Sequence, residues 1–274
     1  MEPTASSLHR AACFLLPIRD AEGVPTAEGR RVGHWFVPIG LGVGVCYAAI
    51  FGGTWSVYGE YFGLRLLPAV VVLTADALFF GNRLLRGLCV MADEFAPEPP
   101  GGGRALRPAV LLFGIWLLLK FALLLAVPKG QAWVPADWRR HLALLYPEQP
   151  LYRTLILMAA WGRWAVLLAL SLGRTRPGEG ARFCRLMADT RLGVVLGWLL
   201  PLVILTVLYC GIRQNAAAGP LVAGITLAAC YLAGVAFSWR LEGQTADSVL
   251  AVGVVGELAF LFAYVPFGRL IHNW

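Results

Sequence analysis

Long apolar runs alternate with short polar segments along the whole chain, and this pattern predicts the architecture. Runs of about 20 residues, the length that crosses the hydrocarbon core of a bilayer, occupy residues 35–54, 63–81, 107–127, 153–173, 192–212, 217–238 and 248–267. Each run is expected to form a transmembrane helix. We therefore expect an all-α, polytopic membrane protein with about seven helices, built as one integral-membrane domain over residues 1–274.

The composition agrees with this assignment and excludes other classes of protein. Hydrophobic residues make up 58% of the 274 residues and charged residues only 14%, and the mean hydropathy is +0.68. The net charge of +7 could indicate nucleic-acid binding, but the basic residues lie in the short segments between apolar runs, where membrane topology explains them. The six cysteines are scattered singly and predict neither a zinc site nor a disulfide scaffold. The expected partner is the lipid bilayer, with no nucleic acid.

The distribution of arginine predicts the orientation. Arginines gather before the first run, between the second and third runs, and between the fourth and fifth. By the positive-inside rule these segments are cytoplasmic in the cell membrane, so residues 1–34, which show no secretory signal, form a cytoplasmic amino-terminal segment. The segments "NRLLRGLCVMADEF", "GRTRPGEGARFCRLMADTR" and "RLEGQTADS" then share the cytoplasmic face, which predicts a site there. Arginines alone would gather on that face in any membrane protein.

The last apolar run carries an acid near its middle that needs a partner. Glu257 follows Asp247 by ten residues, which places it about 15 Å deeper in the membrane, too far to share a metal ion. Arg163 stands ten residues before the predicted cytoplasmic end of the fourth run, at the same depth. Lys120 comes out deeper, at about 20 Å, and Asp76 shallower. We hypothesise a buried Arg163–Glu257 pair; the alternative is that each finds separate partners.

Several stretches, read in order, resemble one family of membrane enzymes. They are "CFLLPI" followed by "GRRVGHWFVPIGLGVGVCYAAIFG", then "LLLKFALL", "GRWAVLLALSLGRTRPGEGARF" and "RLEGQTADSVLAVGVVGELAFL". Together they are similar to adenosylcobinamide-GDP ribazoletransferase, the membrane-bound cobalamin synthase. The resemblance covers nearly the whole chain.

The sequence departs from the family pattern at several motif positions. The family motif His-x-Asp-Gly-Leu-Ala-Asp-x-x-Asp-Gly aligns with "LLRGLCVMADE", where Gly87, Leu88 and Asp93 agree, while Leu84, Arg86 and Val90 replace the His and two Asp. The family motif that follows, Lys-Asp-Ser-Arg-Ile-Gly, aligns with "GGGRAL", which keeps the arginine as Arg104 but lacks the Asp. In the last element Thr245 and Asp247 persist, Glu242 and Ala246 replace glycines, and Val254 stands where the family often has a first Glu.

The resemblance implies a Mg²⁺-dependent transfer reaction. In it α-ribazole or its phosphate attacks the diphosphate of adenosylcobinamide-GDP, and GMP leaves. Mg²⁺ prefers oxygen ligands, so the implied catalytic and metal-binding residues are Asp93 and Asp247, with Glu94 as a further metal ligand; the implied phosphate-binding residues are Arg104, Arg176 and Arg240.

Each of these residues also has a structural interpretation. Asp93 and Glu94 could be solvated in a loop, Thr245 or Asp247 could cap the last helix, and the arginines could merely orient the protein.

Two other functions remain open. The first is a catalytically impaired homologue that serves as a membrane scaffold for other corrinoid-assembly enzymes, which the missing Asp and His residues favour. The second is a small-solute transporter. The lack of an internal repeat and the gathering of polar segments on one face argue against it.

Overall fold

The structure, a computed structural model, describes residues 4–17, 32–62, 66–96, 108–127, 150–210 and 217–272. Its elements are the helices α1 (Thr4–Leu15), α2 (Phe36–Phe62), α3 (Leu66–Ala75), α4 (Asn82–Phe95), α5 (Pro108–Ala126), α7 (Pro150–Ser171), α8 (Ala181–Asp189), α9 (Leu192–Cys210), α10 (Ala218–Arg240) and α11 (Ala246–His272), with a 3₁₀ turn at Gly33–Trp35 and a π-helical segment at Asp76–Phe80. Over these residues no strand forms, so the all-α prediction is confirmed.

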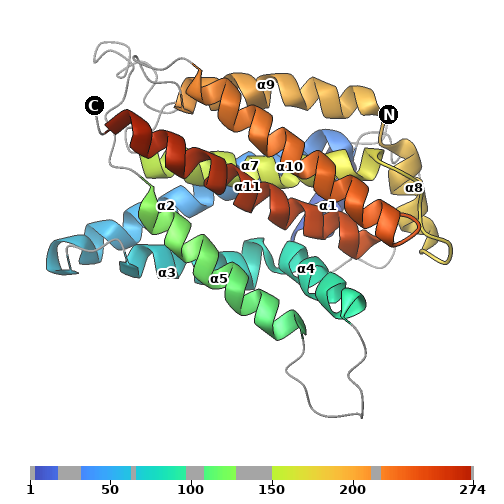
Figure 1. The fold of residues 1–274 in the computed structure, drawn as a ribbon, viewed down its shortest axis with the longest axis horizontal. Helices are drawn as coiled ribbons and strands as arrows, with labels where there is room; N and C mark the ends of the chain where they lie inside the picture. The colour runs from blue at the N-terminus through green and yellow to red at the C-terminus, as the bar shows by residue number, and fades with distance from the viewer. Residues whose placement is uncertain are drawn as a thin grey trace.

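The long helices lie side by side and make this a multi-pass membrane protein. Six helices of the described part are long and apolar enough to cross a bilayer, and a seventh span is obtained if the bent pair Leu66–Phe80 and Asn82–Phe95 is counted as one. Successive spans run in opposite directions along the long axis of the molecule (Figure 1). The two described ends of the chain therefore lie toward opposite ends of the bundle, while the cytoplasmic assignment stays a prediction.

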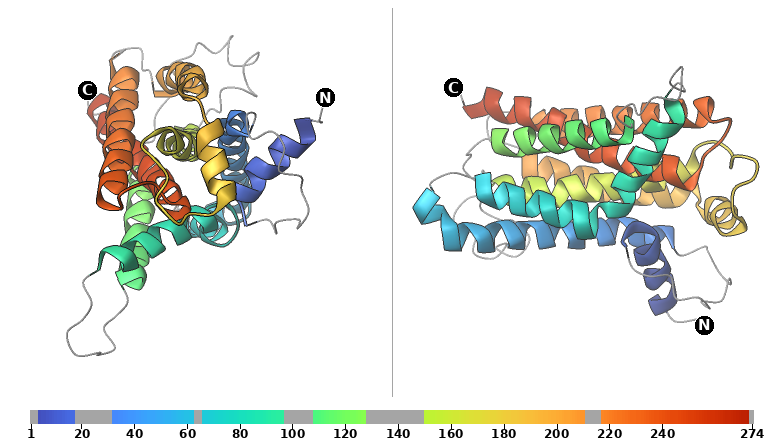
Figure 2. Two further views of the ribbon diagram at one scale, coloured as in Figure 1. Left: turned by 90° about the vertical axis from the view of Figure 1, so that its right-hand side faces the viewer. Right: turned by 90° about the horizontal axis from the view of Figure 1, so that it is seen from below.

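Helix α7 forms the centre of the bundle. Of its membrane-spanning window, 94% is buried, and the view along the bundle shows α2, α9, α10 and α11 arranged around it (Figure 2). Helix α2 approaches α7 closely at Gly40. A Cβ atom at this position would lie only 2.9 Å from the Cα atom of Ala160, so the absence of a side chain allows the contact. Small residues allow this backbone contact in lipid, where packing rather than the hydrophobic effect drives association.

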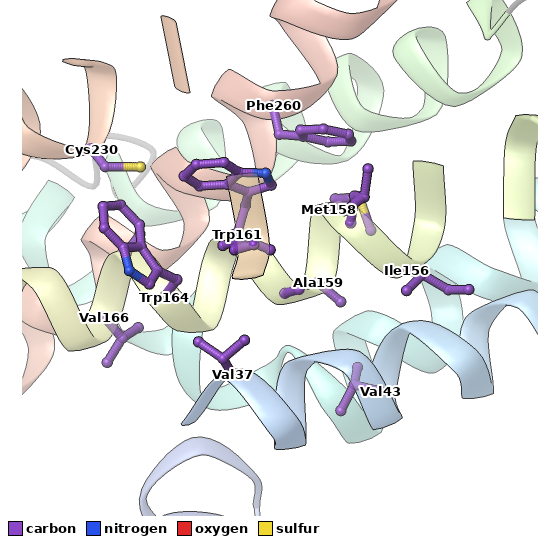
Figure 3. Close-up of a cluster of buried hydrophobic side chains, with 14 of the residues drawn as sticks. Val37, Val43, Ile156, Met158, Ala159, Trp161, Trp164, Val166, Cys230 and Phe260 are labelled. Atoms are coloured by element: carbon purple, nitrogen blue, oxygen red, sulfur yellow. The ribbon is translucent and has the colours of Figure 1, made fainter. Parts of the chain in front are cut away.

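Two buried tryptophans fill the centre of α7. Trp161 and Trp164 pack edge to face with ring centroids 5.3 Å apart (Figure 3). The indole N–H of Trp161 donates to Thr206 Oγ1 at 3.0 Å, and that of Trp164 donates to the Val195 carbonyl at 3.1 Å. Both buried polar atoms are satisfied, so the tryptophans tie α7 to α9.

The second span differs from the expected straight helix over residues 63–81. Helix α3 passes into the π-helical segment, which ends at Phe80 and is followed by Gly81, and the chain then turns by 80° into α4. A Cβ atom at Gly81 would overlap the Asp76 carboxylate, so the turn requires glycine at this position. A π-helical segment is a recognised cause of a sharp kink.

Helix α4 replaces the loop that was expected around Asp93 and Glu94. The buried residues Leu84, Gly87 and Met91 recur every three or four positions and face α11. The expectation of a loop was wrong because the polar residues of this segment occupy only the opposite face of an amphipathic helix.

Candidate functional site

Three segments that are far apart in sequence meet at one end of the bundle, on the right-hand side of Figure 1. The segment after α7 pairs with the turn between α10 and α11: the N–H of Arg176 donates to the Gln244 carbonyl at 3.0 Å, and the N–H of Gln244 donates to the Arg174 carbonyl at 2.7 Å. Gly243, with φ +147°, permits this contact, because a Cβ atom there would lie 2.6 Å from the Arg176 nitrogen.

Helix α4 completes this end of the bundle. Glu94 forms an ion pair with Arg176, and the two side chains are 32% and 42% exposed. The Arg240 guanidinium lies over the Phe95 ring, 5.0 Å from its centroid. A Cβ atom at Gly87 would lie 2.6 Å from the Asp247 carbonyl oxygen, so α4 also contacts the start of α11.

The structure thus brings Glu94, Arg176 and Arg240, three of the residues that the sequence singled out, to the end of α4, and it places a fourth, Asp247, against the middle of the same helix. We call the described residues 93–95, 174–176 and 240–247 the loop-end cluster.

Asp93 has a partner within the described fold. Its Oδ1 accepts a hydrogen bond from the backbone N–H of Ala109, at 3.1 Å, in the first turn of α5. This contact satisfies one of the free N–H groups of that helix and places negative charge at the positive end of its dipole. Asp93 therefore joins α4 to α5. Arg104, the third predicted phosphate-binding arginine, lies outside the described residues.

The polar residues that open α11 form a helix cap. Thr245 Oγ1 accepts from the N–H of Ser248 at 3.0 Å, while Ser248 Oγ accepts from the N–H of Thr245 at 2.9 Å. The Ser248 hydroxyl also lies 2.7 Å from Gln244 Oε1, and the Gln244 amide donates to the Gly234 carbonyl at 2.9 Å. This reciprocal cap explains three of the polar residues that interrupt the apolar pattern. Asp247, partly buried in the first turn, lies at the favourable end of the helix dipole.

The side chains of the loop-end cluster could bind a metal ion only if the substrate and water supplied most of its ligands. Among the described residues, no group of three or more His, Cys, Asp or Glu side chains could hold a metal. One oxygen of Asp93 and one of Glu94 are already engaged. Mg²⁺ nevertheless needs only one or two carboxylates when substrate phosphates and water complete its shell. Asp93 lies against the start of α5, whereas Asp247 lies beside Gly87, six residues earlier on α4. The Mg²⁺ prediction stays a prediction.

A second polar centre lies in the middle of the membrane domain. Arg163 Nη1 and Glu257 Oε1 form an ion pair. The pairing that was predicted from their equal depth in the membrane is therefore present. Lys120 Nζ lies 2.6 Å from Glu257 Oε2 and also forms an ion pair with Asp76. Lys120 and Asp76 were expected to match the depth of Glu257 less well than Arg163 does, yet Lys120 contacts both acids. The flexible lysine stem allows its charge to lie away from the level of its own backbone. We call these four residues the buried quartet.

The buried quartet is electrically balanced and closed to solvent. It contains two anions and two cations, each with a side chain at most 3% exposed. Tyr47 donates a further hydrogen bond to Asp76. Space for Glu257 comes from Gly162, since a Cβ atom there would lie 2.5 Å from Glu257 Cγ. Charges in lipid are costly unless paired, and here every charge has an opposite partner.

Comparison with protein-family models, curated proteins and solved structures gives no match for this chain.

Proposed function

We propose that this protein is a membrane-embedded transferase similar to adenosylcobinamide-GDP ribazoletransferase, acting at the loop-end cluster. The observation that supports this most directly is the contact of Glu94 with Arg176 and of Arg176 with Gln244, because these residues come from three separate stretches of the chain. Two of these stretches carry the family resemblance and the third, which holds Glu94, aligns with the family's Asp-rich motif. A shared site requires such convergence.

The residues of the loop-end cluster suit a diphosphate substrate. Arg176 and Arg240 are exposed cations at the same end of the bundle, and a guanidinium can donate two hydrogen bonds to a phosphate group. The N-terminus of α11 adds partial positive charge beside Asp247. Asp93 and Asp247 would hold Mg²⁺, which when bound neutralises charge on the transferring phosphate. In the reaction, the α-ribazole oxygen forms a bond to the corrinoid-linked phosphorus, the diphosphate bond breaks, and GMP leaves.

A second candidate function is a scaffold that binds the corrinoid nucleotide without turning it over. It is favoured by the contacts that already occupy Asp93 and Glu94, and by Leu84, Arg86 and Val90, which stand where the family has a His and two Asp. Fewer free carboxylates leave less capacity to hold a metal ion.

One experiment separates the two candidates. Purified protein is incubated with adenosylcobinamide-GDP, α-ribazole and Mg²⁺, and both GMP release and equilibrium corrinoid binding are measured. A transferase releases GMP, and Asp247→Asn lowers the rate by orders of magnitude while the folded yield is retained. Asp189→Asn, at the end of α8, is the matched control and keeps the parental rate. Binding without GMP release supports the scaffold, and the absence of both refutes the proposal.

A further inference from the structure

The buried quartet holds both ends of the π-helical segment Asp76–Phe80. At its first residue, the Asp76 carboxylate accepts from Tyr47 and pairs with Lys120. At its last residue, the Phe80 carbonyl accepts a hydrogen bond from Arg163 Nη2 at 2.9 Å. The guanidinium thus contacts Glu257 on one side and the end of the π-helical segment on the other.

The same contacts adjoin the 80° bend that begins α4. The backbone N–H of Gly81 donates to the Asp76 carbonyl at 2.6 Å, which closes the last turn of the π-helical segment. Helix α4 begins directly after this turn, with a hydrogen bond from the N–H of Leu85 to the Gly81 carbonyl at 2.8 Å. The direction of α4 therefore depends on how the π-helical segment is held.

Helix α4 in turn carries carboxylates to the loop-end cluster. It spans 14 residues, so at 1.5 Å per residue its end lies about 20 Å from the bend. A small rotation at Gly81 is thereby amplified at Asp93 and Glu94. Packing of Gly87 against Asp247 and Leu250 restrains α4 midway along its length.

We propose that the buried quartet is a positioning device: by fixing both ends of the π-helical segment it sets the direction of α4 and so the place of Glu94 beside Arg176. It acts at a distance and is not itself part of the loop-end cluster. This positioning role does not depend on whether the protein transfers phosphoryl groups. A proton conduit is the competing use of such charges, but the quartet is closed to solvent and every charge is paired.

The test measures the place of α4 directly. Glu94→Cys and Arg176→Cys are introduced together, and a short bifunctional thiol reagent joins them in the purified, detergent-solubilised protein; mass spectrometry identifies the linked peptides and so distinguishes them from native cysteines. Asp76→Asn is then added, which removes the charge at the start of the π-helical segment with little change of volume. We expect the cross-linking yield to fall about tenfold, because loss of the ion pair at Asp76 lowers the population in which α4 holds residue 94 beside residue 176.

A double variant separates positioning from charge balance. Asp76→Asn leaves the centre with one excess positive charge, whereas Asp76→Asn with Lys120→Met restores neutrality but leaves the π-helical segment held at its first residue only by the hydrogen bond from Tyr47. If the quartet positions α4, the double variant regains thermal stability and keeps the low cross-linking yield. If the quartet only balances charge, stability and yield recover together, and the proposal is overturned. If Asp76→Asn alone does not fold, the cross-linking yield of the double variant still tests the proposal.

Thr206→Val is the matched control. It removes the buried hydrogen bond from Trp161 to Thr206, between α7 and α9 and away from the bend. It should lower thermal stability without changing the yield. An unchanged yield in Asp76→Asn, or an equal loss of yield in Thr206→Val, contradicts the positioning role.

Discussion

The coupling of Arg163 to Glu257 provides the sharpest test of the membrane core. Glu257→Leu leaves Arg163 with the Phe80 carbonyl but without its ion-pair partner, and leaves Lys120 with Asp76, so one positive charge is uncompensated. Arg163→Leu leaves Glu257 bound to Lys120, with one negative charge in excess. Each single change should cost about 3–5 kcal/mol in unfolding free energy, because it strands a buried charge.

The double variant Arg163→Leu with Glu257→Leu should be more stable than the sum of the single losses predicts. The remaining Lys120 and Asp76 are opposite charges in contact, so the centre is neutral again. The Phe80 carbonyl still loses its donor, which leaves a cost of about 1–3 kcal/mol. The two single losses together then exceed the loss in the double variant by at least about 3 kcal/mol, so we expect a favourable coupling energy of about 3 kcal/mol or more, at the upper end of the range known for residues in one ionic network.

The assay is denaturant unfolding in mixed micelles, which gives free energies for the parent, the two single variants and the double variant. A control cycle pairs Glu257→Leu with Thr245→Ala, twelve residues away on α11 and about 18 Å along the helix; these two losses should add. Additivity of the Arg163 and Glu257 losses to within about 0.5 kcal/mol would refute the reasoning.

Three further outcomes can be checked in the same material. Gly162→Ala should lower the unfolding free energy by about 1–3 kcal/mol, because the added methyl group would clash with the Glu257 side chain. Gly114→Ala is the control and should be neutral, because a Cβ atom at Gly114 would have no neighbour within 4 Å. Equal effects of the two substitutions would contradict the packing argument. Thr245→Ala should cost about 1 kcal/mol through loss of the helix cap, measured by the same unfolding assay, with an unchanged stability speaking against the cap. A cysteine placed in residues 99–103 should resist membrane-impermeant thiol reagents in intact cells, and labelling from outside would reverse the predicted topology.

The sequence alone determined the features that depend on local composition. Span number, helical class and the gathering of polar segments at one end follow from run length and from the alternating direction of successive spans. The Arg163–Glu257 contact could also be predicted, because depth along a straight helix is proportional to residue number. The cap at Thr245 was one of two candidates, since Thr and Asp have similar capping propensities.

The tertiary structure decided everything that depends on side-chain reach and on irregular backbone. Residue counting ranked Lys120 and Asp76 as poorer matches for Glu257 than Arg163, because it ignores the lysine stem and the π-helical segment that bring both residues into the buried quartet. No feature of the apolar run over residues 63–81 predicts the 80° bend between α3 and α4. Glycine is required at position 81 because a Cβ atom there would overlap the Asp76 carboxylate, a contact that only the folded structure reveals. The loop-end contacts of Glu94 and Arg240 likewise depend on where α4 points, and that direction is set by packing between distant segments rather than by any local pattern.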